Sequence, residues 1–226
     1  MLNVFGLTIH LYGLLIGLGV WAGLEIALKA RPKLAKEAEQ SFIWALTFGV
    51  IGARIYHVVD YWSRYYSQNL WNIFAVWEGG LGIWGAIVGA ILGLYLYCRI
   101  KNKRMLPILD SFAVGAPIAQ AIGRLGNWAN GELIGKNGEP LFAYEATLNV
   151  LLFTILWRLA KKKTRNGKLF GRYLAGYGII RIILEGLRPN EIIWRVGGVP
   201  TAIIFGVVGI IIGISIIQMD SRSGRE

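Results

Sequence analysis

Residues 80–98 read GLGIWGAIVGAILGLYLYC, a run that contains no charged side chain. A helix that crosses the hydrocarbon core of a bilayer needs about twenty mostly apolar residues, so this run predicts a transmembrane helix. Glycines recur at four-residue spacing within it and again nearer the N-terminus: Gly85, Gly89 and Gly93, and Gly13 and Gly17. Small residues at that spacing let two helix backbones approach closely, which predicts helix packing at both places.

The rest of the chain continues this composition. Of its 226 residues, 55% are hydrophobic and 16% are charged, whereas soluble domains carry about 25% charged residues. The apolar runs predict transmembrane helices near residues 7–28, 41–62, 80–98, 106–126, 143–160, 171–188 and 199–218. We therefore expect an all-α integral membrane protein of about seven transmembrane helices, forming a single transmembrane domain over residues 1–226.

Basic residues concentrate in alternate gaps between these runs. They follow the first, third, fifth and seventh runs: Lys29, Arg31, Lys33, Lys36, Arg99, Lys101, Lys103, Arg104, Lys161, Lys162, Lys163, Arg165, Lys168, Arg222 and Arg225. The other gaps hold mainly Trp, Tyr and turn residues. Because cytoplasmic loops carry the excess of Lys and Arg, this bias predicts an N-terminus outside the cytoplasm and a cytoplasmic C-terminus.

The net charge of +11 does not indicate a nucleic-acid partner. The basic residues lie in short gaps beside apolar runs, which suits anionic lipids rather than nucleic acid. Cys98 is the single cysteine, which excludes an internal disulfide, and two histidines do not favour a zinc enzyme. We expect no metal and no cofactor, and we expect Cys98 to be an inert thiol at the cytoplasmic end of its helix.

Seven charged residues lie inside or at the rims of the apolar runs: Arg54, Asp60, Asp110, Arg124, Glu145, Arg181 and Glu185. A charge at the centre of a membrane helix costs roughly 2.5–3.5 kcal/mol on insertion scales, so such residues normally pair, face a water-filled cavity or take part in chemistry. We expect the three arginines to converge on one outward-opening cavity. Since arginine binds phosphate through two N–H groups at once, they predict an anionic ligand.

Arg181 has a second interpretation. Four residues share one helix face at spacings i, i+4, i+8 and i+11: Tyr177, Arg181, Glu185 and Arg188. Arg181 and Glu185 would then be an intrahelical ion pair that neutralises the helix for insertion. This alternative leaves the other two arginines unexplained.

The segment Gly123–Glu132 has the sequence GRLGNWANGE and ends the fourth apolar run on the expected outer side. Glycine frees the backbone from helical geometry, while amide and guanidinium groups supply hydrogen-bond donors. Non-helical backbone at membrane depth is tolerated where it lines a cavity. We therefore expect a turn here that binds a lipid headgroup.

This segment resembles the signature of the prolipoprotein diacylglyceryl transferase family, G-R-x-G-N-F-x-N-G-E, with Trp128 at the aromatic position. Further matching pieces follow in the family's order: His10-Leu11-Tyr12-Gly13, Gly52-Ala53-Arg54-Ile55, Trp77-Glu78-Gly79-Gly80, Pro140, Tyr144-Glu145, Gly176-Tyr177-Gly178, Arg181 and Glu185. The resemblance covers nearly the whole chain. The seven helices and outside N-terminus of that family agree with the topology expected from the charge bias.

The resemblance implies a multi-pass enzyme of the bacterial plasma (inner) membrane that begins lipoprotein maturation. The family transfers the diacylglyceryl group of phosphatidylglycerol to the thiol of a lipobox cysteine in a prolipoprotein signal peptide, and glycerol 1-phosphate leaves. The implied partners are therefore phosphatidylglycerol, the prolipoprotein and the bilayer, with no metal or cofactor. By position, Arg124 and Arg181 would hold the phosphate and stabilise charge on the leaving group, with Glu132 as a third catalytic residue. The implied substrate-binding residues are Tyr12, Arg54, Asn127, Asn130, Gly131, Tyr177 and Glu185.

Two positions depart from the family's pattern. A histidine often assigned as the general base is replaced by Trp84, and Gly198-Val199-Pro200-Thr201 stands where the family usually has a Gly-Gln element. His57 is the candidate substitute base, since it lies three residues after Arg54 and so on nearly the same helix face. Glu132 is another candidate, and the arginines alone could also lower the thiol pKa.

Other interpretations follow from the missing histidine. His57 has the alternative role of an interfacial, aromatic-like residue. Without a base, the chain would be a non-catalytic relative that binds or moves anionic lipid. A channel or transporter for small anions is a third interpretation, which the absence of paired broken helices and internal repeats in the sequence does not favour.

Overall fold

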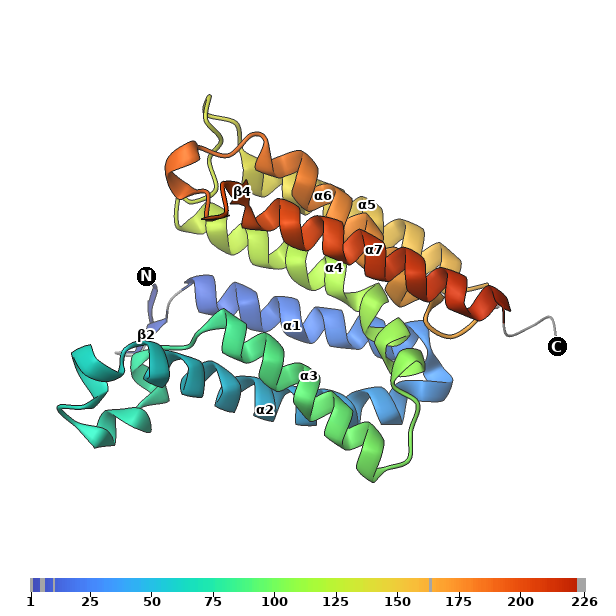
Figure 1. Cartoon of the computed structure of the whole chain (residues 1–226), viewed down its shortest axis with the longest axis horizontal. Helices are drawn as coiled ribbons and strands as arrows, with labels where there is room; N and C mark the ends of the chain where they lie inside the picture. Colours follow the sequence, from blue (N-terminus) through green and yellow to red (C-terminus); the bar gives the residue numbers. More distant parts are fainter. Residues whose placement is uncertain (1, 5–6, 10, 163, 223–226) are drawn as a thin grey trace. The chain divides into compact units, whose positions relative to one another are not determined.

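The computed structural model describes residues 2–4, 7–9, 11–162 and 164–222. His10, Lys163 and Arg225, which carried part of the predictions above, lie outside these residues. Helices dominate the described part (Figure 1). Its strands form only two short antiparallel pairs, β1 (Leu2–Val4) with β2 (Leu7–Ile9) and β3 (Arg195–Val196) with β4 (Val199–Pro200). The predicted all-α fold class is confirmed.

The helices belong to two compact units, of which the first comprises Met1–Ala35 and Leu106–Glu226 and the second Lys36–Met105. The first unit contains α1 (Leu11–Ala30), α4 (Met105–Ala129), α5 (Leu141–Ala160), α6 (Lys168–Glu185) and α7 (Thr201–Arg222). The second contains α2 (Ala35–Asp60) and α3 (Ile83–Ile100). That the whole chain is a single transmembrane domain stays a prediction.

Each of the seven apolar runs forms a helix. The bounds differ most at α2, which begins at Ala35 rather than near residue 41, because the polar residues before the apolar run are good helix formers. Six helices in the described part are long and apolar enough to cross a membrane. The exception is α6, which carries four charged residues: Lys168, Arg172, Arg181 and Glu185. Its crossing and the orientation of the N-terminus stay predictions.

The predicted close packing through the glycines of residues 80–98 is confirmed. In the second unit, a Cβ atom on Gly89 or Gly85 would collide with the backbone of α2. Gly13 and Gly17 do not have this role, since nothing among the described residues lies within 4 Å of a Cβ placed there. In α1 the glycines that meet α4 are Gly19 and Gly23, whose Cβ positions would lie 2.8 Å from the carbonyl oxygen of Ala119 and 3.1 Å from that of Gly115. The spacing of glycines shows that one face of a helix carries small residues, but it does not show which face packs against another helix.

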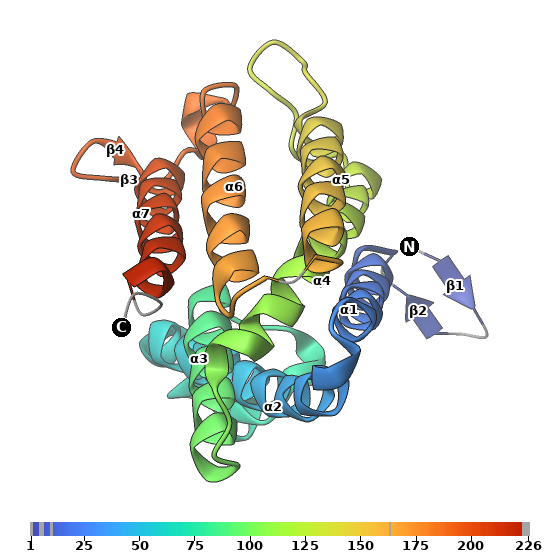
Figure 2. The same ribbon diagram turned by 90° about the vertical axis from the view of Figure 1, so that its right-hand side faces the viewer.

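In the first unit, α5, α6 and α7 run side by side (Figures 1 and 2). Glycines again permit the close approach of α6 and α7, because a Cβ on Gly178 would lie 2.5 Å from the carbonyl oxygen of Gly206. One buried apolar cluster joins α4, α5 and α6: Val114, Leu152, Leu156, Leu169, Ile180 and Leu184. This cluster fixes the three helices that carry the polar residues described below.

Asp110, one of the costly charges, caps the beginning of α6. Its carboxylate is fully buried and accepts hydrogen bonds from the backbone N–H groups of Gly167 (2.7 Å) and Phe170 (2.8 Å). Arg31 also donates to it at 3.1 Å. A carboxylate at a helix N-terminus satisfies free N–H groups and favours the helix dipole. Asp110 therefore has a structural partner set that explains its burial.

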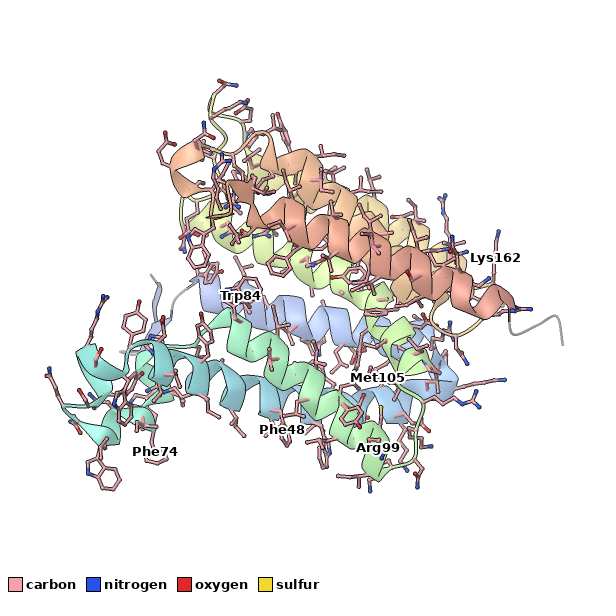
Figure 3. The ribbon with its side chains drawn as sticks, in the orientation of Figure 1. Phe48, Phe74, Trp84, Arg99, Met105 and Lys162 are labelled. Atoms are coloured by element: carbon pink, nitrogen blue, oxygen red, sulfur yellow. The ribbon has the colours of Figure 1, made fainter. Side chains whose placement is uncertain are left out.

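In the second unit, residues 61–82 connect α2 to α3. The connection contains three short helical turns, Trp62–Tyr66, Leu70–Ile73 and Val76–Glu78. Trp84 lies at the beginning of α3 and Arg99 near its end (Figure 3). Several large apolar side chains of the connection are exposed, including Trp71 and Phe74.

Candidate functional site

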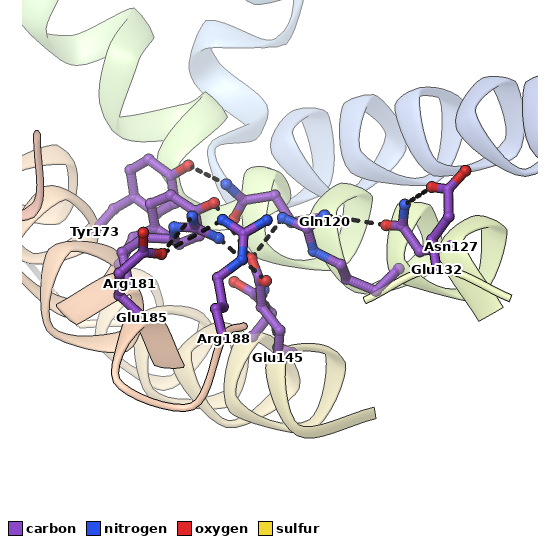
Figure 4. A network of polar contacts seen from close by, with 11 residues as sticks. Gln120, Asn127, Glu132, Glu145, Tyr173, Arg181, Glu185 and Arg188 are labelled. Atoms are coloured by element: carbon purple, nitrogen blue, oxygen red, sulfur yellow. Dashed lines mark hydrogen bonds and ion pairs between the residues drawn. The ribbon is translucent and has the colours of Figure 1, made fainter. Parts of the chain in front are cut away.

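Glu145 is the centre of a charged network in the first unit. Glu145 lies in α5 and is only 2% exposed. Oε1 accepts a hydrogen bond from Arg124 Nη2 at 2.7 Å, and Oε2 pairs with Arg181 Nη1 at 3.4 Å. The Tyr177 hydroxyl donates to Oε1 at 3.4 Å. One carboxylate from α5 therefore holds an arginine of α4 and an arginine of α6 on its two oxygens (Figure 4).

The network continues along the end of α6. Glu185, which is 3% exposed, pairs with Arg181 at 3.7 Å and with Arg188 at 3.4 Å. The predicted intrahelical pair of Arg181 and Glu185 is thus present, but Arg181 also binds the carboxylate of Glu145 on another helix. Both sequence-based interpretations of Arg181 describe part of the same arrangement.

The ion-paired part of the network has more arginines than carboxylates. Three guanidinium groups, those of Arg124, Arg181 and Arg188, face the two carboxylates of Glu145 and Glu185. The carboxylate of Glu132, which is hydrogen-bonded to asparagine amides, makes no ion pair with them. The Nε atoms of Arg124 and Arg188 are buried and have no hydrogen-bond partner within the described residues. Arginine side chains at this site are nevertheless about one fifth exposed, with 24% for Arg124 and 19% for Arg181. Because buried polar groups are normally hydrogen-bonded, this arrangement suits a small anion.

The second terminal nitrogen of Arg124, Nη1, is hydrogen-bonded within the signature segment Gly123–Glu132. Arg124 Nη1 donates to Asn127 Oδ1 at 3.1 Å, and Asn127 Nδ2 donates to Glu132 Oε2 at 2.9 Å. Asn130 Nδ2 donates to the second oxygen of Glu132 at 3.2 Å. Glu132 itself is exposed. The structure therefore brings four predicted residues together, with Glu132 bound to two amides rather than to an arginine.

The predicted turn is shorter than the sequence indicated. Residues 123–129 continue α4, so the two glycines inside them do not break the helix. The turn begins after Ala129 and is closed by Gly131, whose φ of +68° favours glycine, and by the N–H of Glu132 donating to the Asn127 carbonyl at 2.8 Å. Gly126 instead allows contact with α1, since a Cβ there would lie 2.8 Å from the Tyr12 ring. Tyr12 is thus placed against the signature segment.

The loop after this turn is tied by Glu139. Its carboxylate accepts hydrogen bonds from the backbone N–H of Asn137 at 2.9 Å and from the Asn137 side-chain amide at 2.8 Å. The hydrogen bond from the Asn137 backbone lowers the pKa of Glu139 below its ordinary value. The loop therefore keeps a charged, hydrogen-bonded carboxylate at neutral pH.

Arg54 lies in the second unit and has a different set of partners. Its guanidinium donates to the backbone carbonyls of five residues in the connection between α2 and α3: Asn72, Ile73, Ala75, Gly79 and Gly80. The group also lies over the Tyr66 ring, 5.4 Å from its centroid. A guanidinium has five N–H donors, so Arg54 has none left for a phosphate in this arrangement. Arg54 therefore stabilises the loop that connects α2 to α3.

Comparison with known proteins agrees with the sequence resemblance. The model of the family described as "Prolipoprotein diacylglyceryl transferase" matches residues 1–219. A phosphatidylglycerol–prolipoprotein diacylglyceryl transferase of Clostridioides difficile is 36% identical in an alignment that covers 94% of this chain and 91% of the relative. Proteins of the same name from Finegoldia magna (36% identical; 84% of this chain and 83% of the relative covered) and Listeria monocytogenes (32% identical; 95% and 87% covered) are also similar.

The chain belongs to the prolipoprotein diacylglyceryl transferase family. It is accordingly a transferase, and the alternative of a non-catalytic lipid-binding relative is not favoured. The apolar helices make it a multi-pass membrane protein.

His57, the candidate base in this transferase, lies beside Arg54 in the second unit. Its Nδ1 is 2.9 Å from the Tyr66 hydroxyl, and its ring stacks on Tyr61 with centroids 4.5 Å apart. Since Tyr66 contacts both His57 and Arg54, the prediction that these two share a helix face is confirmed. A role of His57 or Glu132 as the base stays a prediction, as does the convergence of Arg54 with the arginines of the first unit.

Sequence reasoning gave no role to three residues that the structure places in the network. Glu145 was recognised as a costly charge, but its position between two arginines was not predicted. Gln120 donates to the Tyr173 hydroxyl at 2.9 Å, next to Tyr177. The spacing in the sequence could have identified Gln120 and Tyr173. Gln120 precedes Arg124 by four residues, and Tyr173 precedes Tyr177 by four, so each shares a helix face with a predicted site residue.

Proposed function

We propose that this chain transfers the diacylglyceryl group of phosphatidylglycerol to the cysteine thiol of a prolipoprotein and releases glycerol 1-phosphate. The observation that carries the proposal is the pair of arginines, Arg124 and Arg181, on the two oxygens of the buried Glu145. The names of the relatives contain both substrates, the lipid and the prolipoprotein. The lipid substrate carries a negatively charged phosphate, which an arginine site with excess positive charge would bind.

Phosphate recognition follows from the charge of the network. A phosphodiester carries one negative charge, which the single excess positive charge of the three arginines and two glutamates would balance. Arg124 and Arg188 each keep a buried Nε without a partner among the described residues. Guanidinium groups bind phosphate oxygens in pairs of parallel hydrogen bonds. We assign phosphate binding to Arg124 and Arg181, with Glu145 and Glu185 holding their guanidinium planes.

The transfer is a displacement at carbon. The acceptor thiolate attacks the glyceryl carbon that carries the phosphate, a C–S bond forms, and the C–O bond breaks with its electron pair going to the phosphate oxygen. Negative charge therefore grows on the departing glycerol phosphate. Fixed cations aimed at growing charge stabilise the transition state more than the ground state. Arg124 and Arg181 supply this stabilisation.

The acceptor thiol must lose its proton before attack. An ordinary cysteine has a pKa of about 8.5, and nearby cations lower it. We propose His57 as the group that takes the proton, with Tyr66 fixing the orientation of its ring through Nδ1. Glu132 is the weaker candidate, because both of its oxygens already accept from asparagine amides.

The remaining assignments concern the lipid and peptide. Tyr12, Tyr177 and the turn of Asn127, Asn130 and Gly131 would line the headgroup site. The acceptor would be the lipobox cysteine of a signal peptide, reached from the bilayer of the bacterial plasma membrane. The N-terminus would then lie outside the cytoplasm, as the distribution of basic residues predicts.

The proposal is tested with purified protein in nanodiscs that contain phosphatidylglycerol and a lipobox peptide. Glycerol phosphate release and the mass of the peptide are measured together. We expect both products, and we expect both to disappear when the peptide cysteine is changed to serine. Lipid binding without either product would contradict the proposed transfer.

A further inference from the structure

A second polar layer lies one helical turn away from the arginines, on the same three helices. Gln120 precedes Arg124 by four residues, and Tyr173 precedes Tyr177 by four, while Asn149 follows Glu145 by four. The arginine network lies near the ends of α4 and α6 and near the beginning of α5. All three steps therefore lead in the same direction along the bundle, by about 6 Å.

The two layers are joined into a closed ring. Gln120 Nε2 donates to the Tyr173 hydroxyl at 2.9 Å. The Tyr173 ring stacks on the Tyr177 ring, with centroids 6.0 Å apart and planes 12° from parallel. Tyr177 then donates to Glu145, which accepts from Arg124. Since Gln120 and Arg124 belong to α4, the contacts start and finish on the same helix (Figure 4).

This layer is not what stability alone would favour. Gln120 Oε1 and Asn149 Oδ1 are buried and have no hydrogen-bond partner among the residues that the structure describes. Asn149 is completely buried. Incompletely satisfied polar groups destabilise a membrane bundle relative to apolar side chains of similar size. Polar residues at such positions are therefore candidates for function.

We propose that Gln120 and Tyr173 are positioning residues for the phosphate site. Their hydrogen bond fixes the Tyr173 ring, which fixes Tyr177 by stacking, and Tyr177 holds the carboxylate that sets the separation of Arg124 and Arg181. Neither residue touches the lipid in this account. The inference rests on the proposed function, because it concerns the same phosphate site.

The test is a double-mutant cycle on this hydrogen bond. Gln120→Leu removes the donor, and Tyr173→Phe removes the hydroxyl while keeping the stacked ring. In each variant, the KM for phosphatidylglycerol is expected to rise about fivefold. The Kd for phosphatidylglycerol, measured without acceptor peptide, is expected to rise by the same factor, which corresponds to the free energy of one ordinary hydrogen bond. The double variant should be no worse than either single one, because all three remove the same bond.

The chain offers a matched control pair. In the second unit, the Tyr97 hydroxyl donates to Gln40 Oε1 at 3.1 Å, so α2 and α3 are also joined by a glutamine–tyrosine hydrogen bond, with the tyrosine as the donor. Gln40→Leu and Tyr97→Phe are expected to leave the KM and Kd for phosphatidylglycerol within about twofold of those of the unsubstituted protein. Loss of folded protein alone lowers the apparent kcat and leaves KM unchanged, so the two effects are separable.

Two results would overturn the proposal. One is an unchanged KM and Kd in the Gln120 and Tyr173 variants, with only the yield of folded protein reduced. The other is a double variant whose losses multiply. If the unsubstituted protein binds phosphatidylglycerol but transfers nothing, the proposed function fails, while the series of Kd values still decides the role of the Gln120–Tyr173 bond.

Discussion

Arg54 and Arg124 have different kinds of partner. Arg54, in the second unit, donates its N–H groups to five backbone carbonyls of one loop. Arg124, in the first unit, shares the Glu145 carboxylate with Arg181, and its Nε has no partner in the described part of the chain. Carbonyl partners can be released only by unfolding the loop that they belong to. The carboxylate of Glu145 is shared by two arginines, of which Arg181 also pairs with Glu185. The same costly residue type thus stabilises a loop in one place and belongs to the proposed phosphate site in the other.

The largest effect is expected from removing either arginine of the shared carboxylate. Arg124→Ala or Arg181→Ala should lower kcat/KM by about a hundredfold to a thousandfold, since loss of one fixed donor to a developing charge costs about 10²–10³. Glycerol phosphate release in nanodiscs measures this loss. Arg158→Ala, an exposed arginine of α5, is the control and should retain full activity. Normal transfer by either site variant would remove the basis for the proposed phosphate site.

A second prediction asks whether the Arg54 region also takes part in the chemistry. If His57 takes the thiol proton, His57→Gln should lower kcat about a hundredfold, within the range of general base catalysis. The Kd for phosphatidylglycerol should not change, because the proposed phosphate site lies in the first unit. Single-turnover kinetics separate the two quantities. Full activity of His57→Gln would show that the arginines alone activate the thiol.

A smaller effect is expected at Arg54 itself. Arg54→Lys keeps the charge but loses the planar set of donors, so the loop of residues 61–82 should loosen. We expect about a tenfold loss of kcat/KM and faster amide hydrogen exchange in that loop. Arg124→Lys, as the matched change in the first unit, should leave exchange in this loop unaltered. Unchanged exchange in Arg54→Lys would contradict the supporting role.

The smallest effect is expected at Cys98. This buried thiol lies near the end of α3 and the nucleophile belongs to the acceptor peptide, so Cys98→Ser should keep kcat/KM within about twofold. Mass spectrometry of the protein after turnover should find no lipid attached to Cys98. A lipidated Cys98 or a large loss of activity would mean that the chain supplies its own nucleophile.

The sequence was informative where a local pattern carries the information. Apolar runs located all seven helices. The segment Gly123–Glu132 was recognised as one polar site because its residues are neighbours in the sequence, although most of it continues α4 and was expected to be a turn. Gly85 and Gly89 were recognised as packing residues, while Gly13 and Gly17 were not the glycines that α1 uses.

What the sequence could not provide depends on which helices are neighbours. Glu145 and Arg181 are 36 residues apart, and only the packing of α5 on α6 makes the carboxylate a shared partner. The carbonyl groups around Arg54 belong to irregular backbone, for which side-chain patterns hold no information. The polar pair of Gln120 and Tyr173 was missed because a neutral polar residue costs less in a membrane helix than a charge and is therefore a weaker signal of function.

The most direct test of the account is the equilibrium affinity for phosphatidylglycerol in nanodiscs of otherwise neutral lipid, measured for the unsubstituted protein and for Arg124→Ala, Arg181→Ala and Arg54→Ala. The account predicts a Kd raised more than about tenfold in the first two variants, the size expected for loss of a charge-assisted hydrogen bond, and changed less than about twofold in Arg54→Ala. An equal loss in all three, or a loss confined to Arg54→Ala, would show that the phosphate is not held by the arginines on Glu145.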